Sequence, residues 1–306
     1  MNGGIFLEPS GVLIVNKGTG LTSHDVINKI RRLYGTKRVG HTGTLDPLAT
    51  GVLVVLVGRA AKAAEYLSAD KKEYIATLRL GITTDTEDVT GSILTQCDSL
   101  PSADAVMTAV NGFEGEIMQT PPMYSALKVN GQKLCDLARR GVTVEREARK
   151  INVYSIECTP TEAPSDYVLR VSCSAGTYIR TLCADIGTTL GCGAAMATLC
   201  RSAAGGFDLE VSHTLEELEQ LSPEERIALL FPTESLFTSL ASVRLSEFYE
   251  KLSRNGCELY QSKIKTSFAI GERVRLCSAD GGFYALGEVR EYQDGTAIKP
   301  IKMFDI

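Results

Sequence analysis

Residues 40–51 read Gly40-His41-Thr42-Gly43-Thr44-Leu45-Asp46-Pro47-Leu48-Ala49-Thr50-Gly51, and this stretch is the most informative part of the chain. It contains a single carboxylate, Asp46, which stands directly before Pro47. Glycine lets a ligand backbone approach closely, and proline fixes the chain beside it. The very apolar run 52–57 follows and reads as a buried strand. We therefore expect a rigid loop that holds one acidic side chain at the edge of a strand.

Positive charge surrounds this loop in the sequence. Residues 17–62 contain eight Lys or Arg side chains and only two acids, Asp25 and Asp46. Neighbouring positive charge favours the ionised form of a carboxyl group. An ionised aspartate held in a rigid loop suits nucleophilic attack on the sugar or base of a polyanion. The alternative is a tight turn in which Asp46 only caps backbone amides.

Charge is segregated along the rest of the chain as well. The net charge is −5, yet residues 128–150 hold seven basic and three acidic side chains, whereas residues 207–240 hold eight acids and one arginine. Such segregation is expected where one face of a protein follows a phosphate backbone. Ordinary solvated helix faces are the alternative interpretation.

The bulk composition indicates a globular protein of about two domains. The chain has 306 residues, and 44% of them are hydrophobic. We find no apolar run of membrane-spanning length and no secretory signal, so we expect a soluble, cytoplasmic protein. Nine cysteines occur without a Cys-x-x-Cys pair, and there are three histidines. We therefore expect reduced thiols and no metal site.

Hydrophobic periodicity predicts the main elements. We expect strands at 11–16, 52–57, 73–80, 151–157 and 167–173, and helices at about 60–67, at 102–111 and after Gly176. A further helix opens near residue 23, with Ser23 as its N-cap. Beyond residue 238 a helix at 245–252 and short strands near 272–277, 283–289 and 296–304 predict a small β-barrel.

Several motifs, in a fixed order, resemble the TruB family of tRNA pseudouridine synthases. Besides the loop 40–51, they are Lys17-Gly18-Thr19-Gly20-Leu21-Thr22-Ser23, the Lys-x-Tyr segment that ends at Tyr74, and Gly176-Thr177-Tyr178-Ile179-Arg180-Thr181-Leu182. Two positions depart from the family pattern: Gly18 stands where many relatives have proline, and Cys135 where many have an aromatic residue.

The resemblance implies an α/β (α+β) pseudouridine synthase fold with a mixed, largely antiparallel central sheet flanked by helices. It places the catalytic domain at residues 1–238, with an RNA-gripping insertion at about 120–150. Residues 283–288 and 298–301 are similar, more weakly, to a PUA-type RNA-binding domain, which would occupy 239–306.

The resemblance also implies residue roles. Asp46 would be the nucleophile, Arg180 would pair with it, and Tyr74 would stack on a flipped-out uracil. The remaining substrate contacts would come from His41, Tyr178 and Leu199. Phosphate contacts would come from Lys17, Lys128, Lys133, Arg139, Arg140 and Arg149. Without the resemblance, Tyr74 and Leu199 can be interpreted as core residues, and Arg180 as a surface residue.

The implied reaction converts uridine to pseudouridine at position 55 in the T-loop of tRNA, in a monomer that needs no cofactor, metal or guide RNA. Attack of Asp46 at C1′ of the ribose or at C6 of the uracil remains open. One rival is a non-catalytic tRNA-binding or RNA-folding protein on the same scaffold. A second is an aspartate-nucleophile hydrolase or phosphotransferase, which would call for an Asp-x-Asp element that Asp46 lacks. Nucleotide-cofactor binding by residues 17–23 is rejected, because no acidic residue follows at ribose-binding spacing.

Overall fold

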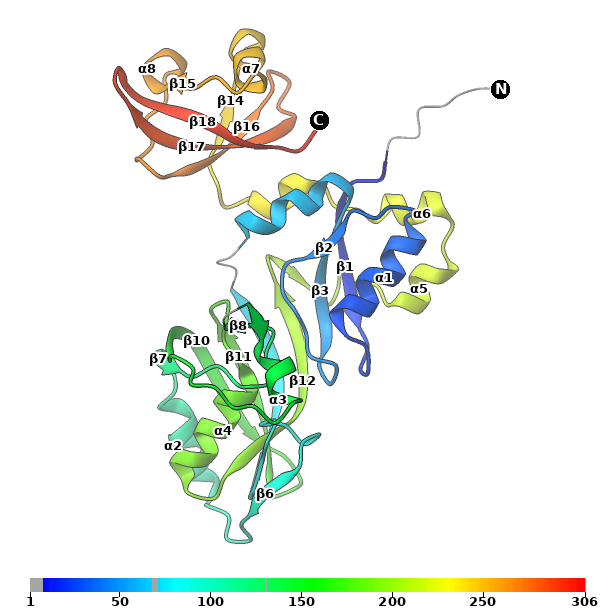
Figure 1. Ribbon diagram of the computed structural model, residues 1–306, viewed down its shortest axis with the longest axis vertical. Helices are drawn as coiled ribbons and strands as arrows, with labels where there is room; N and C mark the ends of the chain where they lie inside the picture. The colour runs from blue at the N-terminus through cyan, green and yellow to red at the C-terminus, as the bar shows by residue number, and fades with distance from the viewer. Residues whose placement is uncertain (1–7, 68–70, 130, 306) are drawn as a thin grey trace.

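The computed structural model describes residues 8–67, 71–129 and 131–305 and consists of two sheets with helices around them (Figure 1). The larger sheet has nine strands in the order β1-β3-β12-β4-β11-β10-β7, with β2 paired to β3 and β13 paired to β12. Only β12 and β3 run parallel, so the sheet is mixed and largely antiparallel, as predicted. Its strands are β1 (Gly11–Lys17), β2 (Val39–His41), β3 (Thr50–Val57), β4 (Lys72–Leu80), β7 (Gly115–Gln119), β10 (Arg149–Pro160), β11 (Asp166–Cys173), β12 (Ala194–Ala204) and β13 (Phe207–Asp208).

Helices cover both faces of this sheet. One face packs against α1 (Ser23–Leu33), α2 (Ala103–Asn111), α4 (Ile179–Leu190) and α5 (Leu215–Gln220). The opposite face of β1 and β3 packs against two 3-10 helices, η1 (Gly58–Tyr66) and η2 (Thr233–Phe237). Because both faces of β3 are buried, its sequence is a continuous apolar run instead of an alternating one. The helix α6 (Pro223–Ala228) follows α5 directly.

The helix α1 begins at Ser23, so its N-cap lies one residue before the predicted one. Thr22 is the N-cap, and it forms a capping box with Asp25. Ser23, predicted to cap the helix, is buried and instead exchanges two hydrogen bonds with the backbone of Leu45, at 2.8 and 3.1 Å. The serine therefore ties the start of α1 to the loop that carries Asp46.

The strand β12 is the main element that the sequence analysis missed. It lies between β3 and β4 and so joins the two halves of the sheet. Its first residues are alanines and a methionine, which have a lower strand propensity than β-branched residues. Packing against both neighbouring strands decides its conformation.

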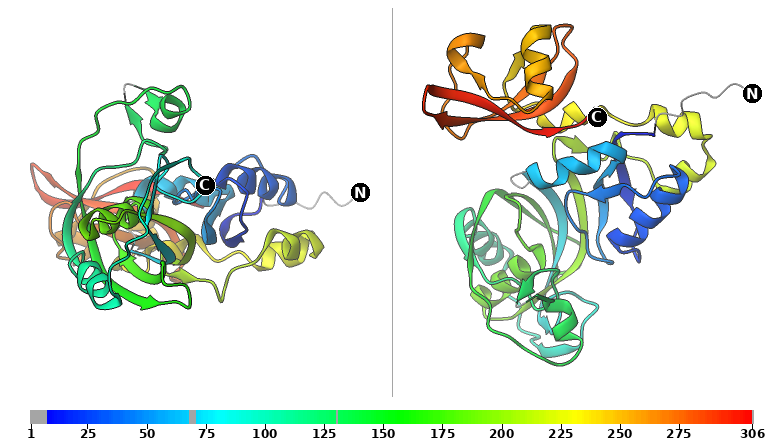
Figure 2. Two further views of the ribbon diagram at one scale, coloured as in Figure 1. Left: turned by 90° about the horizontal axis from the view of Figure 1, so that it is seen from below. Right: turned by 45° about the horizontal axis from the view of Figure 1, so that its top comes forward.

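Two small hairpins and one short helix complete this part of the chain. The hairpins are β5 (Ile82–Thr84) with β6 (Ile93–Gln96), and β8 (Lys128–Val129) with β9 (Gln132–Lys133), and the helix is α3 (Leu134–Ala138). The second hairpin and α3 form a lobe that projects from the sheet (Figure 2, left).

The C-terminal sheet has five strands in the order β14-β16-β17-β18-β15. They are β14 (Ser242–Arg244), β15 (Leu259–Tyr260), β16 (Arg273–Cys277), β17 (Phe283–Tyr292) and β18 (Gly295–Met303), with helices α7 (Glu247–Arg254) and α8 (Gln261–Ile264). The path ends at β14 and β15, so the small β-barrel expected here is a curled, open sheet. These two edge strands span three and two residues and therefore expose few unpaired backbone groups.

The two sheets share a hydrophobic cluster. Val12 and Leu56 of the large sheet belong to the same buried cluster as Leu286 and Phe304 of the small one. Phe304 also stacks on Phe283, with ring centroids 5.4 Å apart. In the described residues, no helix is long and apolar enough to cross a membrane.

Candidate active site

A cavity of about 310 Å³ opens where five segments meet: the loop 40–51, the start of β4, residues 125–127, residues 176–180 at the start of α4, and β12. Five of the residues singled out in the sequence line it, although they come from four separate segments. The side chains that matter below are those of Asp46, Tyr74, Tyr178, Arg180 and Leu199. The volume is in the range of small-ligand sites.

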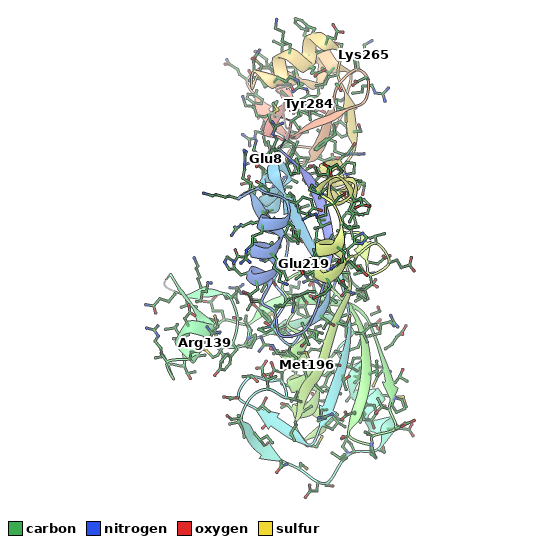
Figure 3. The ribbon with its side chains drawn as sticks, turned by 90° about the vertical axis from the view of Figure 1, so that its right-hand side faces the viewer. Glu8, Arg139, Met196, Glu219, Lys265 and Tyr284 are labelled. Atoms are coloured by element: carbon green, nitrogen blue, oxygen red, sulfur yellow. The ribbon has the colours of Figure 1, made fainter. Side chains whose placement is uncertain are left out.

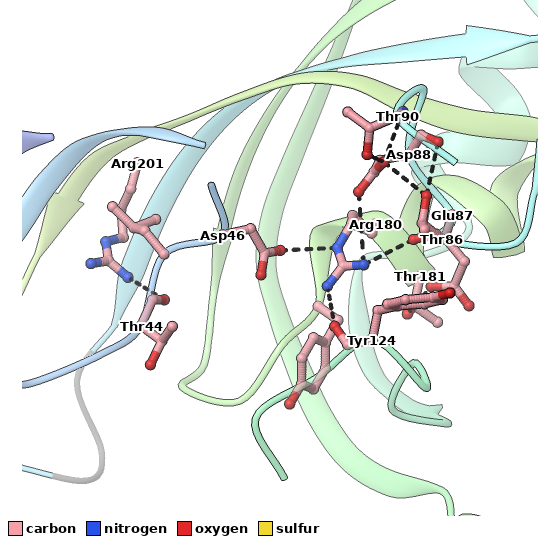
Figure 4. A network of polar contacts seen from close by, with 12 residues as sticks. Thr44, Asp46, Thr86, Glu87, Asp88, Thr90, Tyr124, Arg180, Thr181 and Arg201 are labelled. Carbon is pink, nitrogen blue, oxygen red and sulfur yellow. Dashed lines mark hydrogen bonds and ion pairs between the residues drawn. The ribbon is translucent and has the colours of Figure 1, made fainter. Parts of the chain in front are cut away.

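Asp46 forms an ion pair with Arg180 at one wall of this cavity. Arg180 Nε lies 2.9 Å from Asp46 Oδ2 (Figure 4). The arginine side chain is 5% exposed, whereas that of Asp46 is 38% exposed. A buried guanidinium that pairs with a partly open carboxylate fixes the orientation of the carboxylate.

The rest of the Arg180 guanidinium is bound to the protein. Nη1 donates to the carbonyl oxygen of Thr86 at 2.8 Å, and Nη2 to that of Tyr124 at 2.7 Å. Asp88 Oδ2 lies 3.8 Å from Nη1. These contacts hold Arg180 in one orientation from three sides, so the position of Asp46 is set by segments far apart in the chain.

The sequence analysis missed Asp88, a second carboxylate near Arg180. Asp88 is buried and accepts hydrogen bonds from the hydroxyl groups of Thr86 and Thr90. These bonds close the turn after β5 and aim the Thr86 carbonyl oxygen at Arg180. The alternation of threonine and acid over residues 84–88 is the signal that could have drawn attention to this turn.

Arg201 holds the loop 40–51 from behind, and the sequence analysis missed it too. It lies on β12 and is 1% exposed. Its guanidinium donates to the carbonyl oxygens of Gly43 at 3.1 Å, Thr44 at 3.4 Å and Val52 at 2.7 Å. The arginine thus bridges the two ends of the loop. Glycine is required at position 51, where the chain passes Arg201, since a Cβ there would lie 2.3 Å from the Arg201 carbonyl oxygen.

Lys17 lies inside the protein and not at its surface, so the expectation that it contacts a phosphate is wrong. It is fully buried, and its ammonium donates to the carbonyl oxygens of Gly18 at 2.9 Å, Leu21 at 2.8 Å and Pro47 at 3.5 Å. Burial lowers the pKa of Lys17 to about 8, against an opposing effect of Asp46. The lysine therefore ties the first motif to the Asp46 loop.

Tyr74 and Leu199 form neighbouring parts of the cavity wall. Tyr74 lies on β4 and pairs in register with Arg201, while Leu199 on β12 pairs with Ala76. Both side chains are 8% exposed. Burial raises the pKa of Tyr74, so its phenol stays neutral. Two apolar surfaces therefore face the cavity beside the carboxylate.

Tyr178 is positioned by Gln119, which the sequence analysis did not identify. The Tyr178 N–H donates to Gln119 Oε1 at 2.8 Å, and Gln119 Nε2 donates to the Tyr178 carbonyl oxygen at 3.0 Å. Gln119 is 1% exposed and ends β7, and Tyr178 is the N-cap of α4. The paired bonds fix the backbone just before Arg180.

His41 is the predicted substrate contact that does not line this cavity. It ends β2 and pairs in register with Val55. Burial, followed by the charge of Arg201, lowers the pKa of His41. Its imidazole is therefore neutral at pH 7, and its contact with substrate stays a prediction.

Five of the predicted phosphate contacts lie at the surface. They are Lys128, Lys133, Arg139, Arg140 and Arg149. The first four belong to the projecting lobe, on which Figure 3 labels Arg139. Arg139 contacts Asp136 at 3.4 Å, and Arg140 donates to Gln132 at 2.6 Å. Within the described residues, no three His, Cys, Asp or Glu side chains gather into a possible metal site.

Comparison with known proteins decides the family. Residues 31–179 match the model of the TruB family pseudouridylate synthase N-terminal domain, and residues 180–238 match that of the tRNA pseudouridylate synthase B C-terminal domain. The chain is 40% identical to tRNA pseudouridine synthase B of Clostridium kluyveri over 295 residues, which cover 96% of this chain and 99% of the relative. It is 47% identical to the enzyme of the same name from Francisella tularensis over 233 residues, 76% of this chain and 77% of the relative. The chain belongs to the TruB family of pseudouridylate synthases.

Solved structures confirm the fold of this TruB-family protein. A chain from a Cbf5-Nop10-Gar1 complex superposes with a TM-score of 0.75 at 28% identity, over 96% of this chain and 84% of that one. A chain from an archaeal box H/ACA sRNP Nop10-Cbf5 complex gives a TM-score of 0.72 at 27% identity, over 97% and 86%. The prediction of a pseudouridine synthase fold is therefore confirmed.

Proposed function

We propose that this TruB-family enzyme isomerises uridine to pseudouridine at position 55 in the T-loop of tRNA, with Asp46 as its nucleophile. One observation carries the proposal: the Asp46 carboxylate faces a nucleoside-sized cavity and is held by a buried arginine at 2.9 Å. The relatives named tRNA pseudouridine synthase B supply the substrate class.

The reaction needs a nucleophile that is ionised and aligned before the substrate arrives. Asp46 attacks either C1′ of the ribose or C6 of the uracil, and the N-glycosidic bond breaks. The uracil then turns, C5 bonds to C1′ and Asp46 is released. The C5 proton passes to water, and N1, which has lost its bond to C1′, takes up a proton from water. The ion pair with Arg180 fixes the direction from which the carboxylate approaches the substrate.

The base must leave its stack to reach Asp46, because the enzyme acts on an atom inside a folded RNA. Tyr74 offers a flat surface for the uracil, and Leu199 packs against the base beside it. Tyr178, whose backbone is fixed by Gln119, lines the cavity next to Arg180. The neutral phenol of Tyr74 keeps this wall uncharged.

We propose that the enzyme acts as a cytoplasmic monomer without a guide RNA and grips the T-arm with the basic lobe. The exposed positive charge of residues 128–150 supports the grip on the T-arm. The bacterial relatives are named as a single enzyme, which supports action without a guide RNA. The structural neighbours named above were crystallised with Nop10, and one of them also with Gar1.

The Asp46→Asn variant tests the nucleophile. The amide is nearly isosteric with the carboxylate but is uncharged and not nucleophilic, so tritium release from 5-³H-uridine tRNA should fall to background. Filter binding of the same tRNA should stay within about threefold of wild type, a change below about 1 kcal/mol. Turnover by this variant close to the wild-type rate would refute the role of Asp46.

A further inference from the structure

Glu87, in the segment that connects β5 to β6, has a backbone conformation that few side chains adopt. Its φ is 64°, in the left-handed region, and in the part of the chain that the structure describes the one other non-glycine residue with a positive φ is Lys265, at 54°. A side chain in this region is strained, whereas glycine adopts the same φ freely. Such strain persists only where the surrounding structure holds the residue in place. The Glu87 side chain must therefore contribute something that glycine would not.

The conformation of Glu87 brings three successive residues to the first turn of α4. In an extended chain neighbouring side chains point to opposite sides, so Glu87 and Asp88 could not both reach one helix. Here the Thr86 carbonyl oxygen accepts from Arg180 Nη1 at 2.8 Å, and Asp88 Oδ2 lies 3.8 Å from the same nitrogen (Figure 4). Between them, Glu87 Oε2 accepts a hydrogen bond from the Thr181 hydroxyl at 2.6 Å. This turn therefore binds both Arg180 and the residue that follows it in α4.

The backbone of the same turn is bound to β12. The Glu87 carbonyl oxygen accepts from the Met196 N–H at 3.0 Å, and the Val89 N–H donates to the Met196 carbonyl oxygen at 3.0 Å. The Glu87 N–H donates to the Thr84 carbonyl oxygen at 3.3 Å. None of these bonds uses the Glu87 side chain, so that side chain can be replaced without removing the bonds that fix the turn in place.

The contact between Glu87 and Thr181 is a strong one. Thr181 is 5% exposed, and Glu87 is half-buried. Burial raises the pKa of Glu87, and the hydrogen bond from Thr181 and the charge of Arg180 oppose that rise. A hydrogen bond to a charged group is stronger than one between neutral groups, and a buried polar group is costly to leave without its partner. The carboxylate therefore holds the first turn of α4 against the turn that also binds Arg180.

We propose that Glu87 is a positioning residue, which holds Thr181 and so places the neighbouring Arg180 where its Nε meets Asp46. The proposal rests on the function proposed above, in which this ion pair aligns the nucleophile, and it adds a residue to it. Arg180 and Thr181 are adjacent at the start of α4, so a shift of this helical turn moves both. Glu87 lies outside the described lining of the cavity, so it acts on the substrate only through these residues.

Removal of the carboxylate tests the proposal, and the second strained residue supplies a matched control. Glu87→Gly removes the carboxylate together with the strain, whereas Lys265→Gly removes the same kind of strain at the end of α8. We expect the single-turnover rate of Glu87→Gly at saturating tRNA to fall about tenfold with unchanged tRNA affinity, because a misplaced reacting group costs rate and not binding. Lys265→Gly should match wild type in both. Rates are compared at a temperature at which circular dichroism shows every variant to be folded.

Further variants isolate the hydrogen bond. Glu87→Gln keeps an acceptor oxygen for the Thr181 hydroxyl, so its rate should stay within about threefold of wild type. Thr181→Val removes the hydroxyl and should reproduce the loss of Glu87→Gly, and the double variant should lose no more than either single one. A rate of Glu87→Gly equal to wild type would overturn the proposal, as would losses that multiply in the double variant.

A spectroscopic measurement follows Arg180 without turnover. In protein labelled with ¹⁵N-arginine, the Nε–H resonance that is lost in Arg180→Lys reports the 2.9 Å contact with Asp46. This resonance should shift in Glu87→Gly and stay in place in Lys265→Gly. An unchanged resonance in Glu87→Gly would also overturn the proposal. Because the measurement needs no reaction, it separates failure of the proposal from an absence of synthase activity in the wild type.

Discussion

Three cations are buried around the Asp46 loop, and their polar partners are of two kinds. Arg180 pairs with the carboxylate, whereas Lys17 and Arg201 donate to backbone carbonyl oxygens. Burying an unpaired charge is costly unless hydrogen bonds replace its water. Within the loop, the carbonyl oxygens of Gly43, Thr44 and Pro47 accept some of those bonds, so these contacts also hold the loop in shape.

Lys17 makes the stability of the protein depend on pH in the alkaline range. Its pKa is about 8 in the folded state and 10.5 in the unfolded chain, mainly because of burial. Between these values the unfolded state binds more protons, so the contribution of Lys17 to the free energy of unfolding rises with pH. The slope is at most about 1.4 kcal/mol per pH unit for one proton.

Urea unfolding of wild type and Lys17→Met measures this effect. The stability of wild type relative to the variant should increase from pH 8 to pH 10 and stay constant below pH 7. Comparison with the variant cancels the titration of the buried thiols of Cys173 and Cys183, whose pKa values burial raises to about 11 and about 12. A constant difference across the whole range would show that Lys17 keeps an ordinary pKa.

At the scale of elements, α1 and β12 hold the Asp46 loop between them. Ser23 at the start of α1 binds Leu45 from one side, and Arg201 on β12 binds Gly43 and Val52 from the other. Because both elements are packed in the core, the loop that they bind is also held rigidly. A pre-aligned nucleophile is the expected consequence.

The lobe formed by β8, β9 and α3 is expected to grip RNA without taking part in the chemistry. Replacing Arg139 and Arg140 of the lobe, together with Arg149 at the start of β10, with alanine should weaken tRNA binding, most strongly at low salt. Each lost phosphate contact should reduce the salt slope by roughly 0.7 to 0.9. Filter binding across a salt series measures the slope, while single-turnover rates at saturating tRNA should change little.

Two other variants serve as controls for the lobe. Arg170→Ala removes an arginine that is 60% exposed on β11, away from the lobe, and should leave the slope unchanged. Tyr74→Ala should slow the chemical step and spare the slope, because stacking is not screened by ions. If the triple variant has the same salt slope as wild type, the replaced arginines belong to an ordinary solvated surface and do not contact phosphates.

At the scale of the whole molecule, the two sheets form one packed body. Their shared cluster includes Phe237 and Phe304, whose ring centroids are 5.7 Å apart. Arg59 on η1 donates to the Asp305 carbonyl oxygen at 2.7 Å, and Lys302 on β18 pairs with Glu65. The C-terminal sheet is therefore held in a fixed place relative to the cavity.

A stand-alone enzyme should act on tRNA by itself. We expect the purified protein to convert uridine 55 of an unmodified tRNA transcript without any added RNA or protein. Sequencing after chemical labelling of pseudouridine would locate the product. A transcript with uridine 55 replaced by cytidine is the control. Modification that begins only after a guide RNA is added would contradict the proposal.

The amino-acid sequence by itself determined most of the long elements and which of their faces are buried. Strict alternation placed Tyr74 on the buried face of β4, whereas the pattern of α4 left Arg180 open to interpretation as a surface residue. Such local patterns report which face of an element is buried, because periods of 2 and 3.6 residues follow from backbone geometry. The motif order indicated the family that the comparisons confirmed.

Only the tertiary structure decided which distant groups meet. The burial of Lys17, the contact of Asp88 with Arg180 and the clamp of Gln119 on Tyr178 join residues from different segments. So does Arg201, which binds a carbonyl oxygen 149 positions away in the chain. Periodicity carries no information about such pairings, since they depend on how whole elements pack. The same reason explains why β12, whose neighbours on both sides impose its conformation, emerged only from the fold.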